Sequence, residues 1–192
     1  MKFIHRKYKN QLGFSNVQIA VGILVVVIGL IGSIAGYQYV YQAKVNNDLQ
    51  ELTSISVGVK RYKASVSDFN FGNSTPATFA AQGWIPQNRV RLIDSYDAEI
   101  SSQWSQRGIR MNVSQINNNN DAIQVTYFDV PDYACKELAI TAAGLVDKID
   151  IDEASIKTLG TPIDVPALIN VCNTNGFASS GSHAIVYTIS TI

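Results

Sequence analysis

Acidic residues are absent from the first 47 positions of this 192-residue sequence, and no formally charged residue of either sign occurs from Phe14 to Ala43. Residues 19–37 are the most apolar part of this run. At about 1.5 Å of rise per residue, a helix of roughly that length nearly crosses a hydrocarbon core of about 30 Å. The run is therefore a candidate membrane span, and it precedes a part that carries all the acids.

Histidine is scarce as well, with only His5 and His183 in the chain, and the sequence contains no Gly-x-Ser-x-Gly, His-Glu-x-x-His or P-loop string. We therefore expect no enzyme activity, no catalytic residue and no cofactor. His183 follows Gly181 and Ser182, which predicts an exposed loop histidine. Four acids lie close together: Asp147, Asp150, Asp152 and Glu153. They lack the glycine and the twelve-residue frame of an EF-hand, so we expect a solvated loop and no metal site.

The segment before the apolar run is basic and has no acid: Lys2, His5, Arg6, Lys7 and Lys9. A basic flank predicts that this end stays on the cytoplasmic side of a membrane while the rest of the chain is exported. Without this segment the chain holds 11 lysines and arginines against 15 acids. That balance gives no basic surface excess, so no nucleic-acid partner is indicated.

Two ordinary explanations of the N-terminus are a cleaved secretory signal and a permanent membrane anchor. A cleaved signal has an apolar core of about 7–15 residues followed by a small-residue cleavage site. Here the apolar run is longer, and it continues through Ala35 and Gly36 into further helix-compatible sequence. Hydropathy alone favours an anchor that carries an exported domain and is never processed.

The string QLGFSNVQI at residues 11–19 resembles the prepilin peptidase site of type IV pilins, in which a short basic leader ends in Gly and the mature chain begins with Phe or Met. The resemblance implies cleavage between Gly13 and Phe14, with Phe14 as the N-methylated terminus. In that family the apolar segment stays on the protein, anchors it in the inner membrane before assembly and then forms the core of a filament.

One residue departs from the family pattern. Pilins usually have Glu as the fifth residue of the mature chain, where this chain has Gln18. The role assigned to that Glu is to pair with the terminal amine of a neighbouring subunit, because an unpaired charge in an apolar bundle costs several kcal/mol. Gln18 can accept a hydrogen bond from the amine of Phe14 but cannot neutralise it. The departure is compatible with a weakened subunit-docking contact or with a subunit that needs none.

The only cysteines are Cys135 and Cys172, and neither has a companion His or Cys at metal-ligand spacing. In an exported protein such a pair predicts a disulfide. Closing a loop of this size contributes about 3–4 kcal/mol to stability in the chain-entropy model.

The apolar run continues into an amphipathic stripe whose apolar residues are spaced three or four apart: Val45, Leu49, Leu52, Ile55, Val59, Tyr62 and Val66. Lysines and acids, including Asp48 and Glu51, occupy the intervening positions. Because no proline precedes Pro76, we expect one helix over residues 15–66, close to about 80 Å long. Four glycines in its first half could let helices approach closely and could unwind locally in a filament: Gly22, Gly29, Gly32 and Gly36.

Beyond this helix, turn residues alternate with short runs typical of strands. We expect a helical turn at 78–82, strands at 98–104, 108–115 and 123–127 with a hairpin turn at 117–121, and a helix over 133–146 with Asp132 as N-cap. Residues 148–151 and 155–159 read as short strands or turns, 167–172 as a strand, and 182–192 as the strongest strand of the chain.

These observations predict an α+β fold with a long N-terminal helix of about 50 residues packed on an antiparallel sheet, and a disulfide-bounded C-terminal region. The order of the head resembles that of type IVb pilins. The expected parts are a leader (1–13), an apolar helix half for the membrane and filament core (14–43), an amphipathic half (44–68) and an α/β head (69–192).

The resemblance implies a structural pilus subunit that polymerises with itself and supports adhesion, aggregation or surface contact. Its implied partners are prepilin peptidase and the assembly machinery of the bacterial inner membrane, and its final location is an extracellular pilus. The alternative, favoured by Gln18, is a minor or tip pilin, or a pseudopilin of a type II secretion system.

Overall fold

The computed structural model describes residues 16–65, 75–93, 98–173 and 181–190. It divides into two compact units, Met1–Gln42 and Ala43–Ile192, which we describe separately. Helix α1, Asn16–Ser65, runs through both and confirms the predicted long helix to within a residue at each end. Within the described residues, no helix combines the length and the apolar character needed to cross a membrane.

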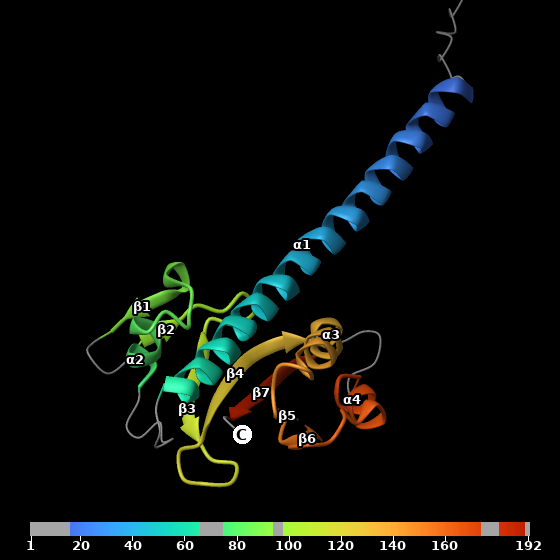
Figure 1. Cartoon of the computed structure of the whole chain (residues 1–192). Coiled ribbons are helices and arrows are strands. Elements are labelled where there is room, and N and C mark those ends of the chain that lie inside the picture. Colours follow the sequence, from blue (N-terminus) through green and yellow to red (C-terminus); the bar gives the residue numbers. More distant parts are fainter. Residues whose placement is uncertain (1–15, 66–74, 94–97, 174–180, 191–192) are drawn as a thin grey trace, which may run out of the picture. The chain divides into compact units, whose positions relative to one another are not determined.

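The second unit contains a seven-stranded antiparallel sheet in the order β1-β2-β3-β4-β7-β5-β6. Its strands are β1 (Val90–Leu92), β2 (Ala98–Ile100), β3 (Ile109–Ser114), β4 (Ala122–Pro131), β5 (Lys148–Ile151), β6 (Ala154–Lys157) and β7 (Ser182–Ser190). Figure 1 shows β4 and β7 as the long neighbouring strands of this sheet. The predicted α+β fold with an antiparallel sheet is confirmed.

Short helices complete the head: α2 (Pro76–Ala81), the 3-10 helix η1 (Gln87–Arg89), α3 (Asp132–Ala142) and α4 (Val165–Val171). Thr75 and Thr78 form a reciprocal capping box at the start of α2, which places this helix two residues earlier than predicted. In Figure 1, α3 and α4 lie next to each other beside β5 and β6.

The α1 stripe forms part of the core of the second unit. Val45, Leu52, Ile55 and Val59 are at most 1% exposed, as the helical spacing predicts. The prediction that Asp48 and Glu51 occupy the polar face is wrong, because both are 1% exposed and face partners in the head. Tyr127 of β4 donates a hydrogen bond from its hydroxyl to Glu51 Oε1 over 3.3 Å.

The β3–β4 hairpin follows the sequence pattern closely. Ile109 and Met111 are buried while Arg110 and Asn112 are exposed, which gives the predicted dry and wet faces. The buried Asp121 carboxylate closes the turn by accepting hydrogen bonds from the backbone N–H groups of residues 116, 117 and 118. Desolvation opposes these bonds, but together they lower the pKa of Asp121.

Several predicted boundaries are wrong for identifiable reasons. The predicted strand at 98–104 ends at Ile100, because Ser102 Oγ accepts the N–H groups of residues 104 and 105 and starts a turn. The strand predicted over 123–127 extends to Pro131 as β4. Helix α3 ends at Ala142 instead of 146, just before Gly144, a residue type that weakens helices.

The segment 167–172 is a helix where we predicted a strand. Asp164 caps α4 by accepting the N–H of Ala167 over 3.0 Å, and Pro166 occupies the first turn, where a missing N–H costs nothing. The prediction that Asp132 is the N-cap of α3 is wrong. Pro131 is the N-cap, and Asp132 is already helical, with its side chain turned to His183.

Candidate functional site

The predicted processing and docking residues fall at the start of the chain. Gly13 and Phe14 lie outside the described residues. Gln18 and the four glycines, Gly22, Gly29, Gly32 and Gly36, lie on the continuous backbone of α1 in the first unit. Their roles in processing, docking and helix packing stay predictions.

Three large apolar side chains that the structure describes in the first unit are exposed. Val26, Tyr39 and Val40 of α1 are 61%, 78% and 57% exposed. Large apolar side chains that lie on one helix and face water favour contact with another apolar surface.

The predicted disulfide is confirmed: Cys135 of α3 is bonded to Cys172 at the end of α4, and both residues are fully buried. Ala134, Leu138 and Ala139 of α3 and Leu168 of α4 are buried around it. The disulfide therefore joins α3 to α4 within the core.

A buried ionic cluster forms where α1 meets the head. Arg89 Nη1 lies 3.3 Å from Asp48 Oδ1 and 2.7 Å from Glu51 Oε2, so one guanidinium faces two carboxylates. Asp48 also accepts hydrogen bonds from Trp104 Nε1 and from Gln103 Nε2. Because a buried charge must be paired, these contacts constrain how α1 lies against the head.

The cluster carries one more carboxylate than cation, and this excess affects titration. Desolvation raises the pKa of Glu51 to about 7, with Arg89 opposing the rise and Asp48 adding to it. Desolvation also raises the pKa of Asp48, against the hydrogen bond from Trp104 and the charge of Arg89. At neutral pH the carboxyl groups of Asp48 and Glu51 are therefore close to sharing one proton.

We expect acidification to stabilise the head through Glu51. The folded protein holds this proton more tightly than the unfolded chain, so the stabilisation is complete below pH 4.5 and is lost as pH rises through about 7. Its size is on the order of 3 kcal/mol. Urea unfolding at pH 5 to 8 should show this slope in the native chain and a much flatter one in Glu51→Gln.

The control for this experiment is Glu99→Gln, because Glu99 pairs with Arg91 on the surface. That variant should retain the slope of the native chain. Equal slopes in the native chain and in Glu51→Gln would contradict the assignment of the titration to Glu51.

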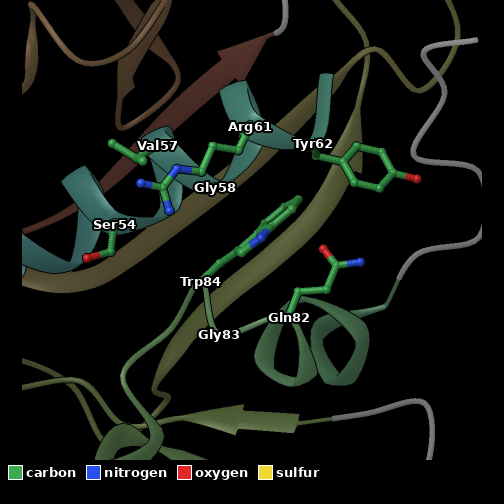
Figure 2. Close-up of a pocket in the computed structure, with 8 residues that line it drawn as sticks. All are labelled: Ser54, Val57, Gly58, Arg61, Tyr62, Gln82, Gly83 and Trp84. Atoms are coloured by element: carbon green, nitrogen blue, oxygen red, sulfur yellow. The ribbon is translucent and has the colours of Figure 1, made fainter. Parts of the chain in front are cut away.

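A glycine on α1 allows close packing beside the cluster. A Cβ atom at Gly58 would lie 2.5 Å from Trp84 Cγ, closer than real Cβ contacts. Figure 2 shows Trp84 beside Gly58, in a cleft whose helix side carries Ser54 and Arg61. Trp84 is held in place, since its ring stacks on Phe79 with a centroid distance of 5.2 Å.

We therefore expect Gly58→Ala to destabilise the head by about 1–3 kcal/mol through overpacking, although alanine favours helices by about 1 kcal/mol. Thermal unfolding and tryptophan fluorescence measure the effect. Gly144→Ala is the matched control, because nothing lies within 4 Å of a Cβ at that position. An unfolding temperature of Gly58→Ala at or above that of the native chain would show that Trp84 can move away at little cost.

His183 is not the exposed loop histidine that we predicted. It lies on β7, is 2% exposed and pairs in the sheet with Val130. Its Nδ1 lies 2.6 Å from Asp152 Oδ2 and its Nε2 lies 2.9 Å from Asp132 Oδ1. The ring thus links β7 to the start of α3 and to the β5–β6 turn.

Three of the four acids around this turn are bonded, in contrast to the predicted solvated loop, while Glu153 is exposed as predicted. Asp147 accepts hydrogen bonds from the N–H and hydroxyl of Ser190, Asp150 pairs with Lys148, and Asp152 also accepts the N–H of residue 184. Among the described residues, no group of three or more His, Cys, Asp and Glu side chains could hold a metal ion.

The fold and these sites can be compared with known proteins. The family model described as PilS N terminal matches residues 42–190, which is most of the chain. The chain belongs to the PilS family of type IV pilins. A search of curated protein sequences finds no match.

A solved pilin structure has the same fold as this PilS-family chain. The crystal structure of the type IVb pilin from Salmonella typhi matches with a TM-score of 0.52 and 16% identity, over 76% of this chain and 99% of the other. TcpA, a type IV pilin from Vibrio cholerae El Tor biotype, matches with a TM-score of 0.48 and 11% identity, over 77% and 99%. The predicted pilin family and its type IVb-like head are confirmed.

Proposed function

We propose that this PilS-family chain is a polymerising structural subunit of a type IV pilus. The observation that carries the proposal is the set of exposed apolar side chains on the first half of α1, which includes Val26, Tyr39 and Val40. In a filament, copies of this helix would cover one another and remove that surface from water. The family assignment supports the same role.

The processing steps are part of the proposal. Prepilin peptidase of the inner membrane removes residues 1–13 by cutting between Gly13 and Phe14, and Phe14 is then N-methylated. The assembly machinery moves the subunit from the membrane into the growing extracellular pilus. The helix half 14–43 forms the filament core, the half 44–68 connects it to the head 69–192, and the division of the chain after Gln42 supports that boundary.

The head is the part that a filament would display. We infer that it supports adhesion, aggregation or surface contact, because it carries exposed polar side chains around a stable disulfide-linked core. No step of this role requires catalysis or a cofactor.

A second candidate is a minor or tip pilin, or a pseudopilin of a type II secretion system, which Gln18 favours because it cannot neutralise the terminal amine of a neighbour. Expression of the chain as the only pilin, followed by electron microscopy of the sheared fraction, separates the two. Filaments built from this chain alone support the major-subunit role. Trace amounts that appear only when another pilin is present support the minor role.

Residue 18 offers a sharper comparison. Gln18→Glu should raise filament yield if the native chain assembles with a weakened contact at the amine of Phe14, because a carboxylate pairs with a charged amine. Gln18→Leu is the control that removes hydrogen bonding altogether and should lower the yield. Equal yields from all three chains would mean that the amine is satisfied elsewhere.

A further inference from the structure

A groove runs along α1 in the second unit. Two clefts, of about 570 Å³ and 470 Å³, lie on the same side of the helix and share Ser54 in their walls. The helix contributes Asn47, Gln50, Ser54, Gly58 and Arg61, which are spaced three or four residues apart and so follow one stripe. From first to last these positions span about 21 Å.

The opposite wall is the connection from α2 to η1, residues 82–89, together with residues 101 and 103. Gly83 in this wall has φ +74, a backbone conformation that favours glycine, and nothing lies within 4 Å of the position that its Cβ would take. Figure 2 shows the end of the groove where Gln82 and Arg61 lie on opposite sides of Trp84.

Four accessible side chains of the groove are neutral amides. The side chains of Asn47, Gln50, Gln82 and Asn88 are exposed, and their amides make no hydrogen bond to the part of the chain that the structure describes. Each amide offers both a donor and an acceptor. The groove therefore presents a row of paired donors and acceptors along its length.

Accessible charge is confined to one end. Arg61 is exposed and pairs with no acid among the described residues. Glu51 and Arg89, at the other end, pair with each other and are largely buried. A ligand that fills the groove thus meets neutral polar groups along most of its length and a single cation at the Arg61 end.

This lining excludes several kinds of partner. An amphipathic helix needs a series of apolar pockets. The apolar groups here are Val57, Pro86 and the rings of Tyr62 and Trp84, and Trp84 is only 8% exposed. An added strand needs a free sheet edge, which a wall of helix and 3-10 turn does not provide. A nucleic acid needs several cations along its backbone.

We propose that this groove binds an oligosaccharide with an acidic group placed at Arg61. Vicinal hydroxyls match the paired donors and acceptors of the amides, and a carboxylate matches the guanidinium. The size of each cleft lies in the range of small-molecule sites. Every residue that forms the site belongs to the second unit of a single chain, so the site is complete without a second copy.

The test uses the full chain in detergent with soluble probes in acidic and neutral pairs: trigalacturonate against maltotriose, and sialyl-lactose against lactose. Saturation-transfer NMR detects binding, and titration gives the dissociation constant. We expect an acidic probe to bind about tenfold more tightly than its neutral partner, as for one charge-assisted contact.

Variants locate the site. Gln50→Ala and Asn88→Ala should each weaken binding about fivefold, the cost of one hydrogen bond. Arg61→Gln should remove the preference for the acidic probe while the neutral one binds as before. Asn119→Ala, an exposed amide in the β3–β4 turn, is the control and should change nothing; equal thermal unfolding temperatures verify that the variants are folded.

The proposal is overturned if none of the four probes binds with a dissociation constant below about 10 mM. It is also overturned if Gln50→Ala and Asn88→Ala bind like the native chain, or if Arg61→Gln keeps the acidic preference. Loss of filaments in a separate assay would leave this result unaffected, so the groove and the polymer are tested independently.

Discussion

Replacement of Arg89 by methionine is expected to lower the free energy of unfolding of the head by about 3–5 kcal/mol at pH 8, because it leaves buried carboxylates without their cation. Arg89 is the basic group that contacts both Asp48 and Glu51, whose side chains are 1% exposed. Trp104, Gln103 and Tyr127 would still donate hydrogen bonds to the carboxylates. Hydrogen bonds alone do not neutralise two buried charges.

The same variant should be less damaged in acid. Desolvation already raises the pKa of both carboxyls, and without the guanidinium each takes up a proton at a still higher pH. The loss measured by urea unfolding should therefore shrink between pH 8 and pH 5. Near-identical losses at the two pH values would show that Arg89 acts through its packing and not through its charge.

Arg91→Met provides the matched control. Arg91 pairs with Glu99 on the surface, with 79% of its side chain exposed, and a surface pair of this kind contributes about 0–1 kcal/mol. If Arg89→Met costs no more than Arg91→Met at pH 8, the buried cluster does not determine how α1 is held.

Removal of the Cys135–Cys172 disulfide has the second large effect. The double variant Cys135→Ala and Cys172→Ala should lose about 3–4 kcal/mol, since the 37-residue separation then adds its freedom to the unfolded chain. Helix α4 has seven residues and few buried side chains, so it should open first. Hydrogen exchange should rise there while β3 and β4 keep their protection.

Two comparisons keep this result interpretable. Reduction of the native chain should reproduce the loss of the double variant, and reduction of the double variant should change nothing. A thermal midpoint that is the same in oxidised and reduced native protein would contradict a stabilising role for the disulfide.

The long helix, the β3–β4 hairpin, the last strand and the disulfide could be predicted because each depends on a local pattern. Helical spacing specifies the buried stripe of α1, and alternation specifies the faces of β3. The disulfide follows because the chain has only two cysteines, Cys135 and Cys172, and is predicted to be exported to an oxidising compartment. These signals do not require knowledge of distant contacts.

The buried ionic cluster could not be found in this way, although a signal existed. Val45, Asp48, Leu52, Ile55 and Val59 are spaced three, four, three and four residues apart, which places Asp48 on the core face. Leu49 lies next to Asp48 and fits nearly the same stripe, so hydrophobicity alone assigns the core position to Leu49. Arg89 lies 41 residues from Asp48, and no local pattern connects them.

His183 shows a similar failure. It has the same parity in β7 as Ile185, Tyr187 and Ile189, all of which are buried, so strict alternation predicts an inward side chain. Its glycine and serine neighbours favoured a loop instead. The two carboxylates that make its burial possible come from distant segments, α3 and the β5–β6 turn.

Cleavage after Gly13 and assembly of this chain into a filament are tested together by intact-mass measurement of the protein recovered from sheared filaments. We expect one dominant species that begins at N-methylated Phe14 and contains the disulfide. A species that begins at Met1, or filaments from which this chain is absent, would contradict it.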